Sequence, residues 1–86
     1  MKYRYEIKQS NNPSLSSADT FKTAVKALAV AKQDFERIYP NRVSDAILRV
    51  FDEDGIMVLV YEKYGSGWVK RQTATEAWSK FRQACN

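Results

Sequence analysis

Two alternating apolar runs, separated by an acidic loop that ends in glycine, set the centre of the expected fold. The runs are residues 46–51 and 56–64, and the loop between them is Asp52-Glu53-Asp54-Gly55. An Asp-Gly pair between alternating apolar segments is the strongest short-range signal for a β-hairpin. Either a two-residue or a four-residue loop places the same side chains on one face. These are Leu48, Val50, Met57, Leu59 and Tyr61.

The N-terminal half carries one strand pattern followed by one helix pattern. Residues 2–8 alternate between aromatic or aliphatic and charged side chains, which predicts a strand with one solvated face. Residues 18–39 have helical spacing, with Ser16 or Ser17 as the N-cap, and Pro40 ends the helix. The expected buried stripe is Phe21, Ala24, Val25, Leu28, Ala31, Phe35 and Ile38.

The C-terminal part predicts one more strand and a second helix. Gly65-Ser66-Gly67 turns the chain into a short strand over residues 68–72, and a three-residue loop pairs Tyr64 with Trp68. Thr73-Ala74-Thr75-Glu76 is a capping box that opens the last helix. Its expected buried stripe is Ala74, Ala77, Trp78, Phe81 and Cys85.

These elements predict a single α+β domain over residues 1–86 with the order β-α-β-β-β-α. The last three strands form an antiparallel meander, and two helices pack on a four-stranded sheet that is mixed or antiparallel. In the mixed arrangement, the first strand lies parallel to residues 46–51 through a right-handed helical crossover. An 86-residue chain is near the lower end of what one core supports.

The residue types needed for common catalytic and metal centres are scarce. The chain has no histidine and one cysteine, and it lacks the phosphate-binding, zinc and redox motifs. We therefore expect no enzyme activity, no catalytic residues, no cofactor and no metal. Asp52, Glu53 and Asp54 are the one acidic cluster, and we interpret it as a solvated turn rather than a divalent-cation site.

Composition bears on the cellular compartment. The sequence has no apolar run of the length that a membrane span needs, and it opens on Met1-Lys2-Tyr3-Arg4 without the apolar core of a secretory signal. A single cysteine cannot form an internal disulfide. These features predict a cytoplasmic protein that does not bind membranes.

A nucleic-acid-binding surface is the first functional hypothesis. The formal net charge is +4 and the pI is about 9.3, values typical of a moderately basic domain. Aromatic and cationic side chains alternate around residues 61–71, and such rings stack on bases while the cations neutralise phosphates of DNA or RNA. The candidate residues are Arg4, Arg49, Lys63, Tyr64, Trp68, Lys70 and Arg71. The structural alternative is that Trp68 and Tyr64 pack under the hairpin.

A protein-binding surface is the alternative hypothesis. If both helices cover the Leu48 side of the sheet, four apolar side chains remain exposed on the other side. They are Ile47, Phe51, Val58 and Val60. Such a face, or a free sheet edge, suits a small interaction module, for example a phage-type or mobile-element-type inhibitor of a host nucleoprotein complex. A homodimer is compatible with either function.

Overall fold

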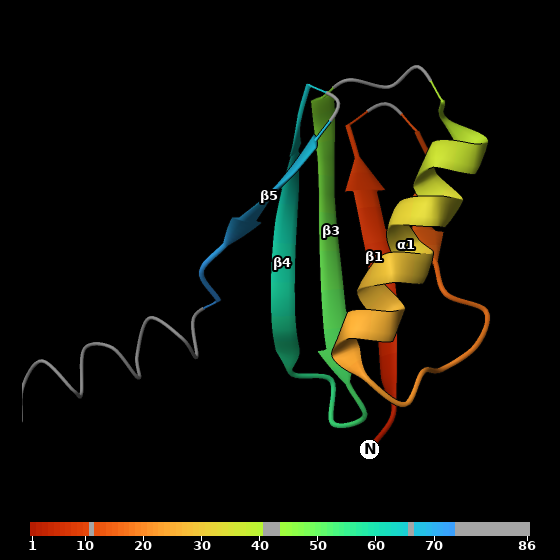
Figure 1. The fold of residues 1–86 in the computed structure, drawn as a ribbon, viewed down its shortest axis with the longest axis vertical. Helices are drawn as coiled ribbons and strands as arrows, with labels where there is room; N and C mark the ends of the chain where they lie inside the picture. The colour runs from red at the N-terminus through yellow and green to blue at the C-terminus, as the bar shows by residue number, and fades with distance from the viewer. Residues whose placement is uncertain (11, 41–43, 66, 74–86) are drawn as a thin grey trace, which may run out of the picture.

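In the part of the chain that the structure describes, one helix packs on one face of a five-stranded antiparallel sheet with strand order β2-β1-β3-β4-β5 (Figure 1), so the fold is a small α+β fold. The computed structural model describes residues 1–10, 12–40, 44–65 and 67–73. In chain order the elements are β1 (Tyr3–Gln9), β2 (Leu15–Ser16), α1 (Ala24–Ile38), β3 (Ser44–Asp52), β4 (Met57–Tyr64) and β5 (Gly67–Arg71).

The predicted hairpin is formed by β3 and β4, and the side chain of Asp52 organises its turn. Asp52 Oδ1 accepts hydrogen bonds from the backbone N–H groups of Asp54 and Ile56, both at 2.9 Å. Gly55 has φ +81°, a conformation that costs glycine little. The register places the predicted side chains on one face, except that a shift after Val50 sets Met57 opposite Phe51. The cross-strand pairs that confirm the facing are Leu48 with Tyr61 and Val50 with Leu59.

Strand β1 pairs with β3 in the antiparallel sense, so the mixed sheet is wrong and the antiparallel alternative is confirmed. The reason lies in residues 10–23, which run back along β1 before the helix begins. Part of this segment is β2, which pairs with β1, and further on Phe21 and Tyr3 exchange two backbone hydrogen bonds of 2.8 Å. The helix consequently starts near the beginning of β1 and ends near its far end, from which β3 returns (Figure 1).

The helix begins six residues later than predicted, because Ser17, directly after β2, is hydrogen-bonded to β1. Its N–H donates to the carbonyl of Tyr5 at 3.1 Å, and its Oγ accepts from the Tyr5 N–H at 3.2 Å. The N-cap is Thr23, whose Oγ1 accepts from the N–H of Lys26 at 3.1 Å. The predicted end is confirmed, since the last helical residue is Ile38, two positions before Pro40.

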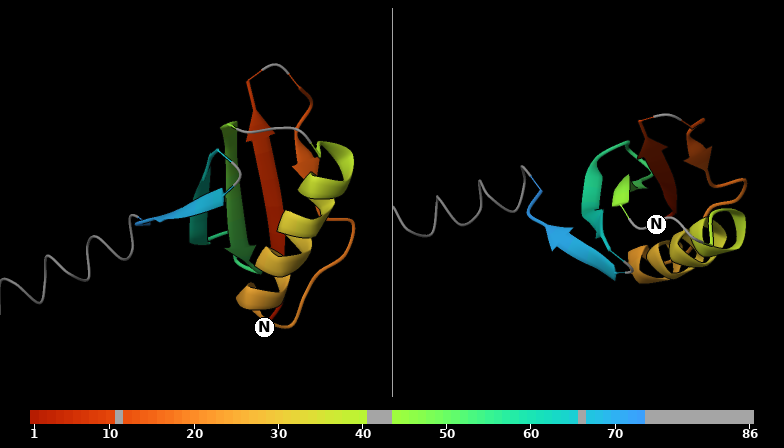
Figure 2. Two further views of the ribbon diagram at one scale, coloured as in Figure 1. Left: turned by 45° about the horizontal axis from the view of Figure 1, so that its top comes forward. Right: turned by 90° about the horizontal axis from the view of Figure 1, so that it is seen from above.

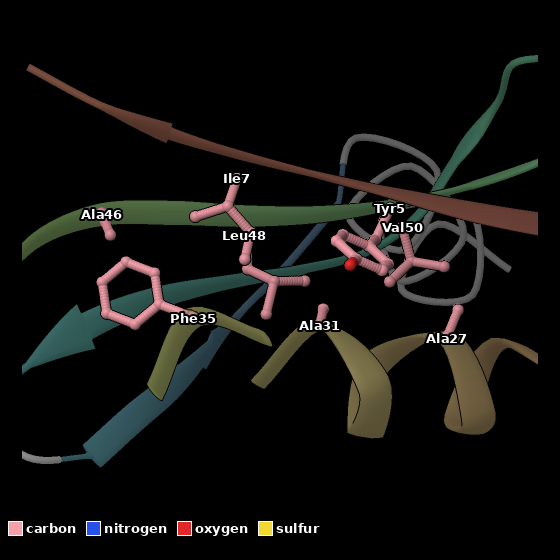
Figure 3. Close-up of a cluster of buried hydrophobic side chains, with 8 residues drawn as sticks. All are labelled: Tyr5, Ile7, Ala27, Ala31, Phe35, Ala46, Leu48 and Val50. Atoms are coloured by element: carbon pink, nitrogen blue, oxygen red, sulfur yellow. The ribbon is translucent and has the colours of Figure 1, made fainter. Parts of the chain in front are cut away.

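Alanines, rather than large aliphatic residues, form most of the buried helix face. Val25 is 73% exposed and Ile38 is 42% exposed, so both are wrongly predicted as core. The small side chains let α1 lie close to the sheet, and a single large ring, that of Phe35, fills the space at the end of the helix. The core in Figure 3 consists of Tyr5, Ile7, Ala27, Ala31, Phe35, Ala46, Leu48 and Val50.

Two further predictions concern the number of elements. The fifth strand, β2, was not predicted, because two residues are too few to show an alternating pattern. The predicted second helix, with Cys85 on its buried stripe, falls on residues 74–86, which lie outside the described residues.

Candidate binding face of the sheet

The register between β4 and β5 decides where the predicted site residues lie. Tyr64 pairs with Gly67 and Lys63 pairs with Trp68, so the connection spans two residues instead of the predicted three. Side chains alternate between faces along a strand, and a shift of one residue therefore moves every β5 side chain to the opposite face. Trp68 and Lys70 consequently lie on the α1 side of the sheet, away from Tyr64.

On that side, Trp68 is a packing residue. Its half-buried indole meets the ring of Phe35 edge-on, with centroids 5.2 Å apart. Lys63 is 3% exposed, and its Nζ lies 5.2 Å from the Trp68 ring centroid. The same ammonium is 3.8 Å from Glu36 Oε1. Lys63 and Trp68 therefore join β4 and β5 to the end of α1.

The other four predicted nucleic-acid contacts come together on the face opposite α1, which we call the open face. These residues are Arg4, Arg49, Tyr64 and Arg71. Glu6, Arg49, Val60 and Arg71 form one continuous cross-strand row from β1 to β5. Figure 2 shows that α1 covers only the other side of the sheet.

The four residues of the predicted protein interface lie on the same open face. Ile47, Phe51 and Val60 pair across the sheet with open-face neighbours, and Val58 follows from alternation along β4. All four side chains are half-buried. The two sets that the sequence offered as alternatives are thus partly merged into one surface.

Two arginines on the open face lie close to aromatic rings. The guanidinium carbon of Arg4 lies 4.6 Å from the ring centroid of Phe51, and that of Arg71 lies 5.3 Å from the ring centroid of Tyr64. Tyr64 is 50% exposed. Arg71 also donates a hydrogen bond from Nη2 to the Tyr64 hydroxyl, so its guanidinium lies toward the hydroxyl end of that ring. A guanidinium close to an aromatic ring makes a favourable cation–π contact.

Carboxylates of the open face are paired with its cations. Arg71 Nε donates to Glu62 Oε2 at 2.7 Å, and this hydrogen bond raises the pKa of Arg71, which keeps its charge at any ordinary pH. Glu6 Oε1 lies 3.8 Å from both Lys8 Nζ and Arg49 Nη1. Among the described side chains, four cations and two carboxylates leave this face positively charged. They are Arg4, Lys8, Arg49 and Arg71, with Glu6 and Glu62.

A hollow of about 430 Å³ lies at one end of the sheet. Here the pairing of β3 with β4 shifts between Ser44 and Ile47, which interrupts the ladder. Tyr64 lines the hollow. The lining residues are Lys8, Gln9, Ser10, Ala46, Ile47, Glu62, Lys63 and Tyr64.

Sequence reasoning missed the contribution of Glu6 and Glu62 to the open face. The alternation of residues 2–8 did place Arg4, Glu6 and Lys8 on one solvated side. What it lacked was the neighbouring strand, because the antiparallel register with β3 depends on the return of residues 10–23. Without that register, Glu6 had no assigned partner.

Comparison with family models, curated proteins and solved structures found no match to this chain. Within the described residues, no group of three or more candidate ligand side chains is arranged to hold a metal ion. In the same part of the chain, no helix has both the length and the apolar character needed to cross a membrane.

Proposed function

We propose that this chain is a non-enzymatic protein that binds single-stranded nucleic acid across the open face of its sheet. The supporting observation is that Arg4, Arg49, Tyr64 and Arg71 gather on this face, where the guanidinium carbons of Arg4 and Arg71 lie 4.6 and 5.3 Å from the centroids of aromatic rings. Proteins bind single strands by stacking bases on aromatic rings and guanidinium planes while cations contact the backbone.

The ion pairs of Glu6 leave Lys8 and Arg49 able to bind phosphate. Glu6 is 3.8 Å from each of its two partners, and exposed pairs of this kind contribute about 0–1 kcal/mol. A phosphate replaces such a carboxylate at little cost and releases counterions from the nucleic acid. Glu6 and Glu62 remain as repulsive charges, so we expect moderate affinity.

The spread of the cations favours a single strand over a duplex. The row from Glu6 to Arg71 crosses four neighbouring strands, which makes it a broad sheet surface. Reading the major groove requires a helix or a narrow two-stranded ribbon that enters the groove. An unpaired strand, in contrast, can lie across a sheet with its bases on the surface.

The test is fluorescence anisotropy with labelled single-stranded DNA, single-stranded RNA and duplex DNA at about 50 mM salt. We expect single strands to bind, with log affinity falling against log salt at a slope of about −2 to −3 for three or four phosphate contacts. Arg49→Ala should weaken binding and reduce the slope by about 1. Arg37→Ala, which removes the same charge from exposed α1, is the matched control and should have little effect.

Absence of binding to all three nucleic acids at low salt would refute the proposal. Equal losses for Arg49→Ala and Arg37→Ala would also count against the open face, because they would indicate a response to total charge alone. Circular dichroism of each variant shows whether its fold is intact.

A protein partner on the same face is the second candidate, favoured by its apolar side chains Ile47, Phe51, Val58 and Val60. The cations of the open face suit a partner whose interface has an acidic border, such as a component of the nucleoprotein complex that a phage-type inhibitor would block. Peptides selected from a displayed random library on the full chain should combine apolar and acidic residues. They should bind in high salt and fail to bind Val58→Asp.

A further inference from the structure

We propose that the outer edge of β5 pairs with β5 of a second copy of this chain, joining two sheets into one. This inference concerns the edge of the sheet and does not depend on what the open face binds. Two observations carry it, namely the state of the two sheet edges and the self-complementary order of the side chains along β5.

The two edges of the sheet differ in their capacity to pair. One edge is β2, which has two residues. The other is β5, which has five residues and pairs with β4 at every one of them without a register shift. Among the described residues, no strand pairs with the other side of β5, so its outward backbone N–H and C=O groups form a template for another strand.

Strand β5 lacks two of the features that usually prevent edge pairing, although it carries the charged residues Lys70 and Arg71. It contains no proline and no bulge, and four of its five residues are exposed. It also diverges from the layer formed by α1, as the right-hand view of Figure 2 shows, so the helix does not cover its outer edge. Val69, at its midpoint, is 43% exposed.

The sequence of β5 fits an antiparallel copy of itself about a two-fold axis at Val69. In this register Val69 faces its own counterpart, and Trp68 faces Lys70 of the second copy. Gly67 faces Arg71 of the second copy. Each cation therefore lies opposite an uncharged residue, and a lysine beside an indole adds a cation–π contact.

A neighbouring register is less favourable. A two-fold axis at Lys70 would set two ammonium groups directly opposite each other, and like charges in that arrangement destabilise a sheet. The Val69 register instead centres a β-branched apolar pair on the axis. This preference favours the Val69 register over the Lys70 register.

The axis of such a dimer is perpendicular to the sheet, so both open faces point to the same side. This consequence rests on the proposed function: one nucleic-acid strand would then contact two copies, and the second contact would form intramolecularly. The dimer itself is tested without nucleic acid, so its failure and that of the proposed function are distinguishable.

Sedimentation equilibrium of the full chain tests the mass. We expect a concentration-dependent dimer for the wild type and for Val69→Thr, and a monomer for Val69→Asp, in which two carboxylates would meet at the axis. Val58→Asp, on the open face, should still dimerise. A wild type that stays monomeric into the high micromolar range, or a Val69→Asp protein that still dimerises, would overturn the proposal.

Disulfide trapping provides a second test that does not rely on a disruptive variant. Facing residues in an antiparallel pair have Cβ atoms about 4.5–5.5 Å apart, close enough for a disulfide after a small adjustment. In a Cys85→Ala background, Val69→Cys should form a covalent dimer under mild oxidation. Thr20→Cys, at an exposed position remote from β5, is the matched control and should remain monomeric on a non-reducing gel.

Discussion

The indole of Trp68 packs edge-on against the ring of Phe35 with centroids 5.2 Å apart. We therefore expect Trp68 to contribute to stability and not to binding. Trp68→Ala should lower the free energy of unfolding by roughly 2–3 kcal/mol, somewhat less than for a fully buried tryptophan. Nucleic-acid affinity, measured where the variant remains folded, should stay close to that of the wild type. Urea unfolding and fluorescence anisotropy measure the two quantities.

Tyr64→Ala is the matched comparison, since Tyr64 lies four residues earlier on the opposite face and is 50% exposed. We expect the reverse pattern: stability changed by less than about 1 kcal/mol, and affinity reduced roughly tenfold through loss of a stacking ring. A Trp68→Ala protein that keeps its stability but loses binding would place the site on the α1 side instead.

Glu6 provides a gain-of-affinity prediction. Its carboxylate lies 3.8 Å from Lys8 Nζ and from Arg49 Nη1, where it competes with an incoming phosphate. Glu6→Gln removes the negative charge and keeps the shape, so binding to a single-stranded oligonucleotide should tighten about two- to fivefold at low salt. Asp19→Asn, an exposed site outside the sheet, should change the affinity less. Weaker binding by Glu6→Gln would contradict a phosphate site here.

Asp52 tests the interpretation of the acidic loop as a turn. Its Oδ1 accepts two backbone N–H groups at 2.9 Å and the residue is 9% exposed. Asp52→Ala should therefore cost about 1–3 kcal/mol, because two turn donors lose their acceptor. Glu53→Ala, in the same loop and exposed, should be nearly neutral. Calcium at millimolar concentration should leave the Tm of the wild type unchanged, and a large upward shift would argue for a cation site.

The elements that local sequence signals specify were predicted well. The Asp52–Gly55 loop and the alternation around it gave the facing of β3 and β4, and Pro40 gave the end of α1. Both signals act within a few residues and need no information from distant parts of the chain. The same holds for the solvated side of residues 2–8.

Elements that depend on distant pairing were predicted less well. The Gly65-Ser66-Gly67 sequence is compatible with a two-residue or a three-residue loop. The difference of one residue in loop length decides whether Trp68 faces α1 or the open face. The direction of β1 relative to β3 depends on β2 and on the Phe21–Tyr3 bridge, which involve contacts across most of the N-terminal half. Both errors affected where the residues of the candidate site were expected to lie.

The helix illustrates how packing distance overrides residue size. Val25 is 73% exposed, whereas Ala27 is fully buried against the sheet. Val25→Glu should therefore change stability by less than about 0.5 kcal/mol, as surface changes usually do. Ala27→Leu should destabilise the fold by about 1–3 kcal/mol, because the extra carbons have no space between α1 and the sheet. Thermal unfolding of the two variants tests which face of the helix is buried. A larger loss of stability for Val25→Glu than for Ala27→Leu would instead support the predicted face, with Val25 in the core.

Tyr5 should make the stability of the fold depend on pH in the alkaline range. Its side chain is buried, its hydroxyl donates to Asp34 Oδ2, and burial together with this carboxylate raises the pKa of Tyr5 to about 12 from the usual value near 10. The folded state thus holds the phenolic proton more tightly than the unfolded state does. The resulting stabilisation is fully present below about pH 10 and is lost as the pH rises through 12. Tyr5→Phe should cost about 1–2 kcal/mol at pH 7 through the lost hydrogen bond. The difference between wild type and Tyr5→Phe in urea unfolding should shrink between pH 10 and 12, whereas a constant difference would show that folding does not raise the pKa of Tyr5.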